Sequence, residues 1–408
     1  MSLFALQRAP RTIVFGSGQR ASLAMHARAL GQKALIVTDE RMGGGAALGE
    51  LVDALKTAGV AVAVFDRTLP EVPLDCIDQC VAFGQSFGPD LVIGLGGGSC
   101  LDMAKVTAVL LAHGGSPRDY FGEFKVPGLV LPLIAVPTTS GTGSEATPVA
   151  VVADSERLLK VGIASPHIIP LVAICDPELT LSAPAGLTAI AGADALTHAI
   201  EALTAGPRSV DAGTSHEHVF VGKNALSDGH AREAIGYLAR GLRRSVENGQ
   251  DLAARESVMH GALLAGLAFG TAGTSAAHAI QYPVGALTKT AHGAGVACLL
   301  PYAMTFNLGH ATASMAEVAV AMGVAEAGDD DRGNAERAIV AVETLFGAIG
   351  IPANLAALGL AQDQLDWTAE QSLGAARLVK NNPRPLDLPA MQAIINAAFS
   401  GERHRLAN

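Results

Sequence analysis

The chain has 408 residues, which is more than one hydrophobic core usually supports, so two domains are expected. Apolar residues make up 50% and charged residues 16%, and 28 basic against 38 acidic side chains leave a formal net charge of -10. This charge argues against a nucleic-acid or anionic-membrane surface, so a small molecule is the expected partner.

The N-terminal stretch MSLFALQRAPRTIVF has neither the basic segment nor the apolar segment of a secretory signal, and no run of 18 apolar residues follows it. The odd number of cysteines argues against a disulfide framework, and their spacing argues against a zinc knuckle. We expect all five to be free core thiols: Cys76, Cys80, Cys100, Cys175 and Cys298. These features predict a cytoplasmic protein without a membrane segment.

Short β-branched runs alternate with helical segments over the first part of the chain. The predicted strands are 12–15, 34–38, 60–65, 91–95, 131–136 and 172–176. This alternation predicts an α/β domain of Rossmann-like type with a parallel sheet. From about Pro184 the chain becomes Ala- and Leu-rich with helical periodicity, which predicts an all-helical domain. We place the dinucleotide-binding domain at 1–184 and the metal- and substrate-binding domain at 185–408.

Two further segments are predicted to be loops of the helical domain. Residues 206–229 are polar and rich in Gly, Ser and His, and they include an exposed His216-x-His218 pair. Residues 323–336 are acidic and are expected to be solvated.

A buried strand runs into glycines and a helix in LVIGLGGGSCLDMAK, residues 91–105. Gly96, Gly97 and Gly98 allow close approach of a phosphate, and Ser99 is expected at the helix N-cap, where unpaired N–H groups attract an anion. The segment therefore predicts a pyrophosphate cradle. A glycine-rich turn without a ligand is the plainer alternative.

A second glycine motif, FGSGQRA at 15–21, fits G-x-G-x-x-A with Asp39 at the end of the next strand. Both glycine segments can serve one ligand. The Asp39 carboxylate can accept hydrogen bonds from the adenosine ribose and repel a 2'-phosphate, so NAD is expected rather than NADP. An ordinary helix N-cap is the alternative role for Asp39.

Two further segments, 84–88 and 137–145, are candidate functional loops. Residues 84–88 spell G-x-S-x-G, but this motif precedes a strand, whereas a nucleophile elbow follows one, so a hydrolase is not predicted. PTTSGTGSE, residues 137–145, follows a predicted strand and is rich in hydroxyl groups. We expect it to face the ligand at the carboxyl end of the sheet, although a solvated loop has the same composition.

Asp194 and His198 stand four residues apart in a helical pattern, so both side chains leave the same helix face. His278 begins a later helical pattern, and His292 follows fourteen residues after it. Three imidazoles and one carboxylate suit a first-row divalent ion such as iron or zinc. Taken singly, each histidine fits an ordinary core or surface position.

Four segments resemble the successive signatures of the iron-containing (group III) alcohol dehydrogenases: GGGSCLDMAK, PTTSGTGSE, GADALTHAIEAL and HAIQYPVGALTKTAHGAGVACLLPY. The resemblance covers nearly the whole chain and implies a dehydroquinate synthase-like architecture with a cleft between its domains. It implies that the GGGS turn takes the pyrophosphate and that Thr138 and Thr139 lie beside the dinucleotide. We expect three more residues of these motifs to contact the cofactor: Asp102, Ser140 and Thr142. The resemblance also implies that Asp194, His198, His278 and His292 bind the ion.

One position departs from many family members, because Tyr282 stands where a second histidine is often assigned a proton-relay role. Tyr282 can relay a proton or simply line the pocket. Tyrosine here, and NNPRPL at 381–386, resemble the hydroxyacid-oxoacid transhydrogenase branch. An acidic substrate is the corresponding alternative, with Lys160, Lys289 or Arg384 as its partner; an ordinary surface charge is the plainer role for each.

The predicted function is hydride transfer between NAD(H) and a small alcohol, aldehyde or ketone, assisted by one Fe(II) or Zn(II) ion. A dehydroquinate synthase-like cyclase is a rival, although the cleft motifs have few basic residues for a phosphorylated substrate. A non-enzymatic sensor of NAD or metal is a second rival. The resemblance also implies a homodimer or higher homo-oligomer.

Overall fold

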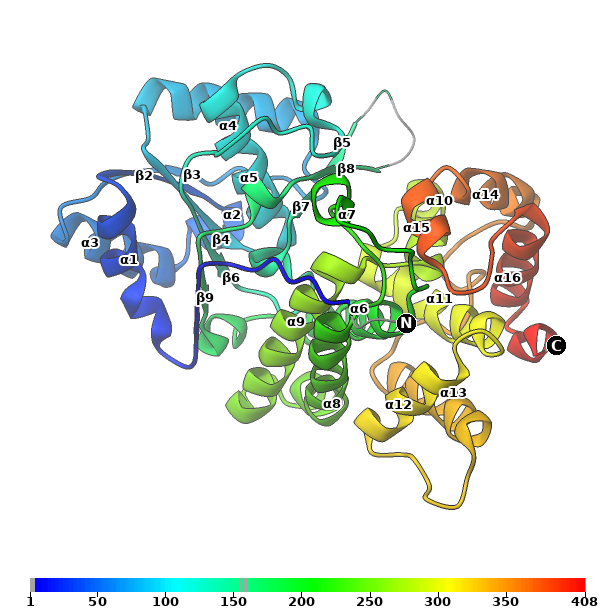
Figure 1. The fold of residues 1–408 in the computed structure, drawn as a ribbon. Helices are drawn as coiled ribbons and strands as arrows, with labels where there is room; N and C mark the ends of the chain where they lie inside the picture. The colour runs from blue at the N-terminus through cyan, green and yellow to red at the C-terminus, as the bar shows by residue number, and fades with distance from the viewer. Residues whose placement is uncertain (1–3, 155, 157–159, 408) are drawn as a thin grey trace. The chain divides into compact units, whose positions relative to one another are not determined.

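In a computed structural model, the structure describes residues 4–154, 156 and 160–407 (Figure 1). The chain forms two compact units. One unit comprises Arg8–Ser182 with Gly213–Val219, and the other comprises Met1–Gln7, Ala183–Ala212 and Phe220–Asn408. The first is an α/β unit and the second is helical, in the chain order that the sequence predicts.

The α/β unit is built on a six-stranded parallel sheet with the order β1-β9-β6-β4-β2-β3 within the described residues. Its strands are β1 Thr12–Phe15, β2 Lys33–Val37, β3 Ala61–Phe65, β4 Leu91–Gly96, β6 Leu133–Pro137 and β9 Val172–Cys175. Each of these strands coincides with one of the runs predicted from the sequence. The predicted parallel sheet is confirmed.

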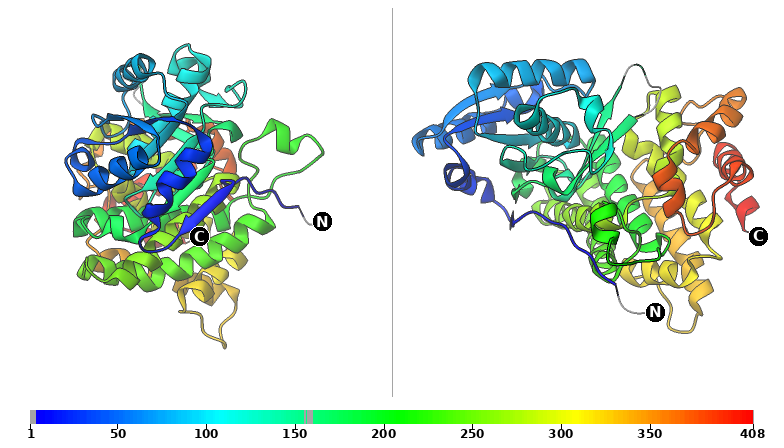
Figure 2. Two further views of the ribbon diagram at one scale, coloured as in Figure 1. Left: turned by 90° about the vertical axis from the view of Figure 1, so that its left-hand side faces the viewer. Right: turned by 45° about the horizontal axis from the view of Figure 1, so that its top comes forward.

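Helices cover both faces of this sheet (Figures 1 and 2). They are α1 Leu23–Leu30, α2 Glu40–Gly43, α3 Ala46–Thr57, α4 Leu74–Phe87 and α5 Gly98–His113. Alternate residues of β2 enter different cores: Leu35 and Val37 pack with α4 and α5, whereas Ala34 and Ile36 pack with α1 and α3. A strand that is buried on both faces has a continuous run of apolar residues. Inner strands such as β2 could therefore be predicted from the sequence.

A smaller sheet in the same unit was not predicted. It has the order β5-β8-β7, formed by β5 Gly122–Glu123, β8 Lys160–Ala164 and β7 Val149–Ala153. β7 and β8 are antiparallel, and β5 is only two residues long. Such short strands carry little periodicity, so their pairing depends on distant partners.

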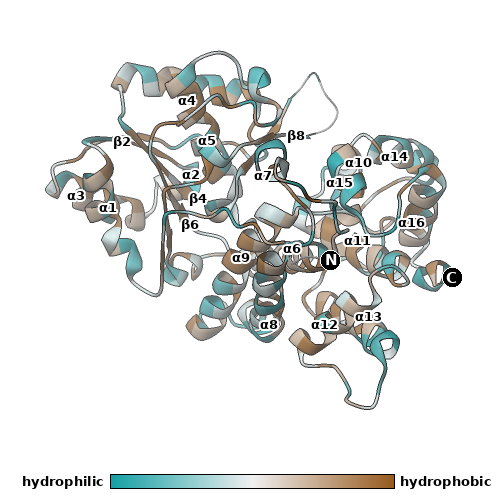
Figure 3. Cartoon of the chain, in the orientation of Figure 1, coloured by the Kyte–Doolittle hydropathy of each residue, from teal (hydrophilic) through white to brown (hydrophobic). Residues whose placement is uncertain are grey.

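The second unit is helical throughout its described residues. Its helices are α6 Ala185–Thr204, α8 Ala225–Glu247, α9 Leu252–Ala272, α10 Ala276–Thr288, α11 His292–Asn307, α12 Thr312–Met322, α13 Asp331–Ala348, α14 Leu365–Ser372, α15 Ala376–Asn381 and α16 Leu388–Ser400. α6, α9 and α11 are buried along most of their length. α8 carries both polar and apolar residues along its length (Figure 3), and its apolar residues pack on α6 and α9.

The two predicted loops are shorter than expected. α8 already begins at Ala225, where Asn224 caps it, and α7 Thr214–Glu217 adds a short helix within the α/β unit. α13 begins at Asp331 because Asp330 caps its first turn through the N–H of Gly333. Side-chain capping thus extends helices into segments whose composition is typical of loops. His216 and His218 are exposed, as predicted.

All five cysteines are free and buried, as predicted. Among the described residues, no single helix has the length and apolar composition needed to span a membrane. α9 and α10 pass that test only as a pair, and they meet at a bend of 100°.

Candidate functional site

The strand order creates a topological switch point between β2 and β4. From β2 the chain continues to β3 toward one edge of the sheet, whereas from β4 it continues to β6 in the opposite direction. Open parallel sheets bind ligands at the carboxyl ends of the strands beside such a point. Asp39 follows β2 and the turn Gly97-Gly98-Ser99 follows β4, so both predicted cofactor segments lie at the switch point.

The hydroxyl-rich loop after β6 packs against this glycine turn. The N–H of Thr138 donates to the carbonyl of Gly96 at 2.9 Å. A Cβ atom on Gly98 would lie 2.5 Å from Thr142 Cγ2, and one on Gly97 would lie 3.4 Å from Thr139. Position 98 must therefore be glycine for the turn after β4 and the loop after β6 to approach each other. The structure brings together three segments that the sequence identified separately.

Polar atoms around the turn fit a dinucleotide. Thr138 Oγ1 and Ser140 Oγ are buried and have no hydrogen-bond partner among the described residues. Buried hydroxyl groups without a partner are uncommon in native proteins, so they indicate a ligand. The N–H groups of the first turn of α5 and its helix dipole add donors and positive potential for a pyrophosphate.

The predicted N-cap of α5 is wrong by two residues. Gly97 caps the helix, and Ser99 is already its second residue. The Ser99 hydroxyl instead accepts a hydrogen bond from the N–H of Glu71 at 3.2 Å. With glycine at the cap, no cap side chain occupies the hydrogen-bond donors of the first turn of α5.

Asp39 caps α2 through the N–H of Met42 at 2.9 Å, so the ordinary role weighed for it is present. Its second oxygen accepts a weak hydrogen bond from the Cys100 thiol at 3.8 Å, which ties β2 to α5. Asp102, on the second turn of α5, accepts from Ser144 Oγ at 2.6 Å and from Val151 N at 2.9 Å. A contact of either carboxylate with the cofactor stays a prediction.

The other glycine motif, at 15–21, lies at the end of β1, the edge strand of the sheet. The N–H groups of Gly18 and Arg20 both donate to the Asp176 carboxylate, at 3.1 and 3.0 Å. This side chain occupies the anion position of the motif, and β1 and β4 are separated by β9 and β6. The two motifs therefore do not share a ligand. The G-x-S-x-G segment lies at the end of α4, so the hydrolase alternative is excluded by its context.

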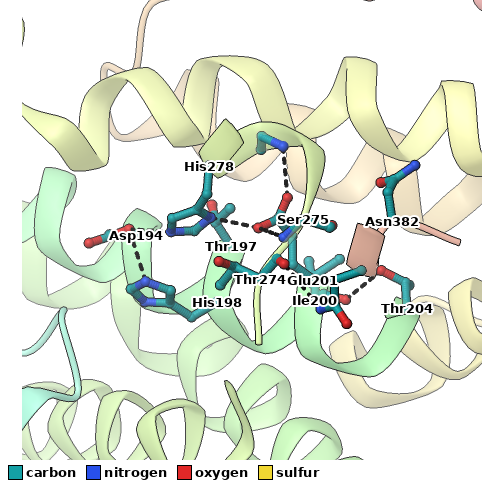
Figure 4. A network of polar contacts seen from close by, with 12 residues as sticks. Asp194, Thr197, His198, Ile200, Glu201, Thr204, Thr274, Ser275, His278 and Asn382 are labelled. Carbon is teal, nitrogen blue, oxygen red and sulfur yellow. Dashed lines mark hydrogen bonds and ion pairs between the residues drawn. The ribbon is translucent and has the colours of Figure 1, made fainter. Parts of the chain in front are cut away.

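Four side chains of the helical unit lie close together. Asp194, His198 and His278 are buried and can be seen in Figure 4, and His292 is partly buried. Asp194 Oδ1 lies 3.7 Å from Nε2 of His198 and 3.7 Å from Nε2 of His278. The ring centroids of His198 and His278 are 4.7 Å apart, and those of His278 and His292 are 5.3 Å apart. Asp194, His278 and His292 each offer one ligand atom within 4.8 Å of the others. All four predicted ligands are thus neighbours.

Local structure explains the convergence. Asp194 and His198 share a face of α6, His278 lies in the first turn of α10, and His292 is the first residue of α11. Gly293 is needed beside it, since a Cβ there would lie 2.5 Å from the Ile190 carbonyl and 3.1 Å from Asp194 Cβ. Close packing of α11 on α6 brings the last ligand to the other three.

The electrostatics of the cluster suit a cation. Burial raises the pKa of Asp194, but the three imidazoles outweigh burial and hold this pKa well below its usual value. Burial lowers the pKa of His278, but Glu201 and Asp194 outweigh burial and raise it to about 9. Asp194 Oδ1 and His278 Nε2 are buried without a hydrogen-bond partner in the described part of the chain. These orphaned donor atoms fit one divalent ion.

Glu201 is the main residue of the site that sequence analysis missed. It is buried on α6, and its carboxylate contacts His278 Nδ1 at 2.6 Å (Figure 4). The signal was present in the sequence, because Glu201 follows Asp194 by seven residues and so shares its helix face.

Tyr282 lies one helical turn after His278 on α10, and its ring centroid is 6.3 Å from that of His292. Burial raises its pKa, so the phenol stays protonated at neutral pH. A relay role for this hydroxyl stays a prediction.

Each of the three basic residues considered for an acidic substrate has its own local surroundings. Lys160 begins β8 and forms an ion pair with Glu71 at 2.7 Å. Arg384 donates to the Phe306 carbonyl at 3.0 Å and stacks on the Phe306 ring. Lys289 terminates α10 in a left-handed conformation with φ of 57°. Their proposed role toward a carboxylate stays a prediction.

Comparison with known proteins agrees with this arrangement. The family description "Iron-containing alcohol dehydrogenase" matches residues 10–177, and "Fe-containing alcohol dehydrogenase family, C-terminal" matches residues 188–399. Long-chain-alcohol dehydrogenase 1 of Geobacillus thermodenitrificans is 36% identical over 95% of this chain and 94% of its own length. The NAD-dependent methanol dehydrogenase of Bacillus methanolicus is 33% identical over 96% of this chain and 98% of its own.

A solved structure of a 1,3-propanediol oxidoreductase has a TM-score of 0.90 and 32% identity, and the match covers 97% of this chain and 100% of that one. Two family matches account for most of both units, and the relatives match along nearly their whole length. The chain therefore belongs to the iron-containing alcohol dehydrogenase family.

Proposed function

We propose that this protein is an NAD-dependent dehydrogenase that interconverts a small alcohol and its aldehyde or ketone with the help of one divalent metal ion. The observation that carries the proposal is the cluster of one carboxylate and three imidazoles. Asp194, His278 and His292 offer ligand atoms within 4.8 Å of one another, and His198 Nε2 lies 3.7 Å from Asp194 Oδ1. Asp194 and His278 carry buried atoms that have no hydrogen-bond partner in the described part of the chain. When bound, the cation supplies Lewis acidity to the substrate oxygen and NAD supplies the hydride acceptor or donor.

The residues of the helical unit hold the cation in this proposal. Asp194, His198, His278 and His292 are its ligands, and Fe(II) or Zn(II) fits their nitrogen and oxygen donors. Tyr282 lies near the His292 ring and is positioned to hold a proton or to line the substrate pocket.

The residues of the α/β unit hold the dinucleotide. The pyrophosphate binds at the start of α5. Gly96 and Gly97 lead from β4 into the helix, and Gly98 and Ser99 are its first two residues. The hydroxyl groups of Thr138, Thr139, Ser140 and Thr142 bind the rest of the cofactor, together with Asp102. Asp39 receives the adenosine ribose and disfavours the 2'-phosphate of NADP. Assembly as a homodimer or larger homo-oligomer stays a prediction from the family.

The test incubates the purified protein with NAD and a panel of alcohols in the presence of Fe(II), Zn(II) or Mn(II), while the absorbance of NADH is followed. We expect NADH with at least one metal and one primary alcohol. No NADH with any alcohol under all three metals would overturn the proposal. Turnover that requires an oxoacid and releases no free NADH would instead establish the transhydrogenase alternative.

Two matched pairs assign the activity to the two sites. His292→Ala should lower turnover by at least about 100-fold, whereas the exposed His216→Ala should not. Gly98→Ala should raise the Kd for NAD by roughly tenfold, because the new methyl group collides with Thr142 and displaces it. The control Gly49→Ala, which meets nothing within 4 Å, should leave NAD binding unchanged.

A further inference from the structure

The Glu201 carboxylate directs three hydrogen-bond contacts to the start of α10. Its Oε1 accepts from the N–H of Ala277 at 2.8 Å, and its Oε2 accepts from the N–H of Ser275 at 2.9 Å. Oε2 also lies 2.6 Å from Nδ1 of His278 (Figure 4). Glu201 is 2% exposed, so these three contacts replace all of its water.

The contact with Glu201 decides which nitrogen of His278 is available to a cation. An ionised carboxylate can only accept hydrogen bonds, so Nδ1 must carry the hydrogen that lies between the two residues. In the neutral ring the other nitrogen, Nε2, then keeps its lone pair. That Nε2 atom is the one that lies 3.7 Å from Asp194 Oδ1.

The same carboxylate fixes where His278 lies. Ser275 is the N-cap of α10, and Ala277 and His278 belong to its first turn. Because Glu201 accepts from the N–H groups of Ser275 and Ala277 and contacts the imidazole of His278, it ties the first turn of α10 and the side chain of one ligand to α6. α6 also carries Asp194 and His198, so a single helix sets the positions of three of the four ligands.

We infer that Glu201 is a positioning residue for the metal site: it fixes the tautomer and orientation of His278 so that Nε2 faces the cation. This role rests on the proposed metal site. Carboxylates that hold a ligating histidine typically change metal affinity by about 10-fold to 100-fold when they are lost.

Glu201→Gln separates this role from simple helix capping. A glutamine has one acceptor oxygen and one NH2 donor in place of two acceptors. If its oxygen faces Ala277, the NH2 group takes the place of Oε2. The bond from the Ser275 N–H is then lost, and the NH2 group facing Nδ1 forces the hydrogen of the ring onto Nε2, which blocks the cation. If its oxygen faces Nδ1, the NH2 group faces the N–H of Ala277 and one cap bond is lost.

The experiment titrates metal-free protein with Zn(II) and with Co(II), and records the Co(II) absorption spectrum and the melting temperature of the metal-free form. Glu201→Gln should weaken the Kd for both ions by about 10-fold to 100-fold and change the Co(II) spectrum. Glu201→Asp keeps the charge and the acceptor atoms, so it should recover part of the affinity. The control Thr204→Val removes another buried hydrogen bond of α6, from Thr204 Oγ1 to the Ile200 carbonyl, and should leave the Kd unchanged.

The outcomes are distinct. If Glu201→Gln lowers only the melting temperature and binds both ions as the wild type does, Glu201 is merely a helix cap and the inference is wrong. Should Glu201→Gln fail to fold, Glu201→Asp takes its place. A weaker Kd for both ions together with a changed Co(II) spectrum would support the inference, and the wild-type Kd and spectrum would contradict it. Wild-type protein that binds neither ion would overturn the metal site itself.

Discussion

Asp39 has two structural contacts and one proposed functional role. One carboxylate oxygen caps α2, and the other accepts the thiol of Cys100 in α5. The residue lies at the carboxyl end of β2, next to the strand that leads into the glycine turn. In the proposed cofactor site, a negative charge at this place would repel a phosphate on the adenosine ribose.

We expect Asp39→Asn to change cofactor preference without a loss of fold. Asparagine caps helices as well as aspartate does, so α2 keeps its first turn. Loss of the charge removes about 1 kcal/mol of repulsion toward a 2'-phosphate, which is roughly a fivefold change. The measurement is the ratio of kcat/KM for NADP to that for NAD. The control is Asp53→Asn, which makes the same change of charge at an exposed position of α3 and should leave the ratio unchanged. An unchanged ratio in Asp39→Asn would contradict the proposed place of Asp39 beside the adenosine ribose.

At the scale of elements, α5 both begins the proposed cofactor site and anchors the chain that follows the hydroxyl-rich loop after β6. Asp102 accepts from Ser144 and Val151, and Lys105, one turn later, donates to both oxygens of Thr147 and to the Val149 carbonyl. Lys105 is fully buried. Burial lowers its pKa to about 8, against the opposing effect of nearby carboxylates.

Lys105→Met should lower the free energy of unfolding by about 2–5 kcal/mol, because it leaves buried acceptors without a donor and carboxylates without a cation. Urea denaturation measures the change. The KM for NAD should rise as well. The segment that follows the hydroxyl-rich loop would lose the hydrogen bonds that Lys105 donates to Thr147. Lys56→Met, on the exposed side of α3, serves as the control. A wild-type unfolding curve for Lys105→Met would show that α5 does not hold this segment.

At the scale of the whole molecule, Glu145 makes stability depend on pH. It is 3% exposed, and burial raises its pKa from the ordinary 4.5 to about 7. Between these two values the folded chain keeps a proton that the unfolded chain has released. The free energy of unfolding therefore falls as pH rises from about 4.5 to about 7, and this contribution is constant above that range.

In Glu145→Gln this fall should disappear. The variant should gain stability at pH 8 relative to the wild type, on the order of 1–3 kcal/mol, and gain little at pH 4. Urea denaturation at several pH values gives the comparison. Glu50→Gln, exposed on α3, controls for loss of a carboxylate. Equal pH profiles for the wild type and Glu145→Gln would show that this group does not titrate between folded and unfolded chains in that range.

The local sequence determined the main strands and helices and the residue types of the candidate metal ligands. The four inner strands of the main sheet, β9, β6, β4 and β2, are buried apolar runs, and α6 carries Asp194 and His198 at helical spacing. Each could therefore be identified from a window of a few residues. The N-cap of α5 and the ends of the loops were predicted incorrectly. A single side-chain contact, such as that of Asn224 with Ser227, is enough to move the start of a helix.

Only the tertiary structure decided which of two glycine turns lies at the switch point and which carboxylate supports His278. Both depend on neighbours far apart in the chain. Strand order places residues 15–21 at the sheet edge beside Asp176, and hydrogen bonds at the start of α10 join Glu201 to an imidazole 77 residues away. Sequence patterns report contacts along one helix or strand, whereas these contacts join different elements and exist only once the chain has folded.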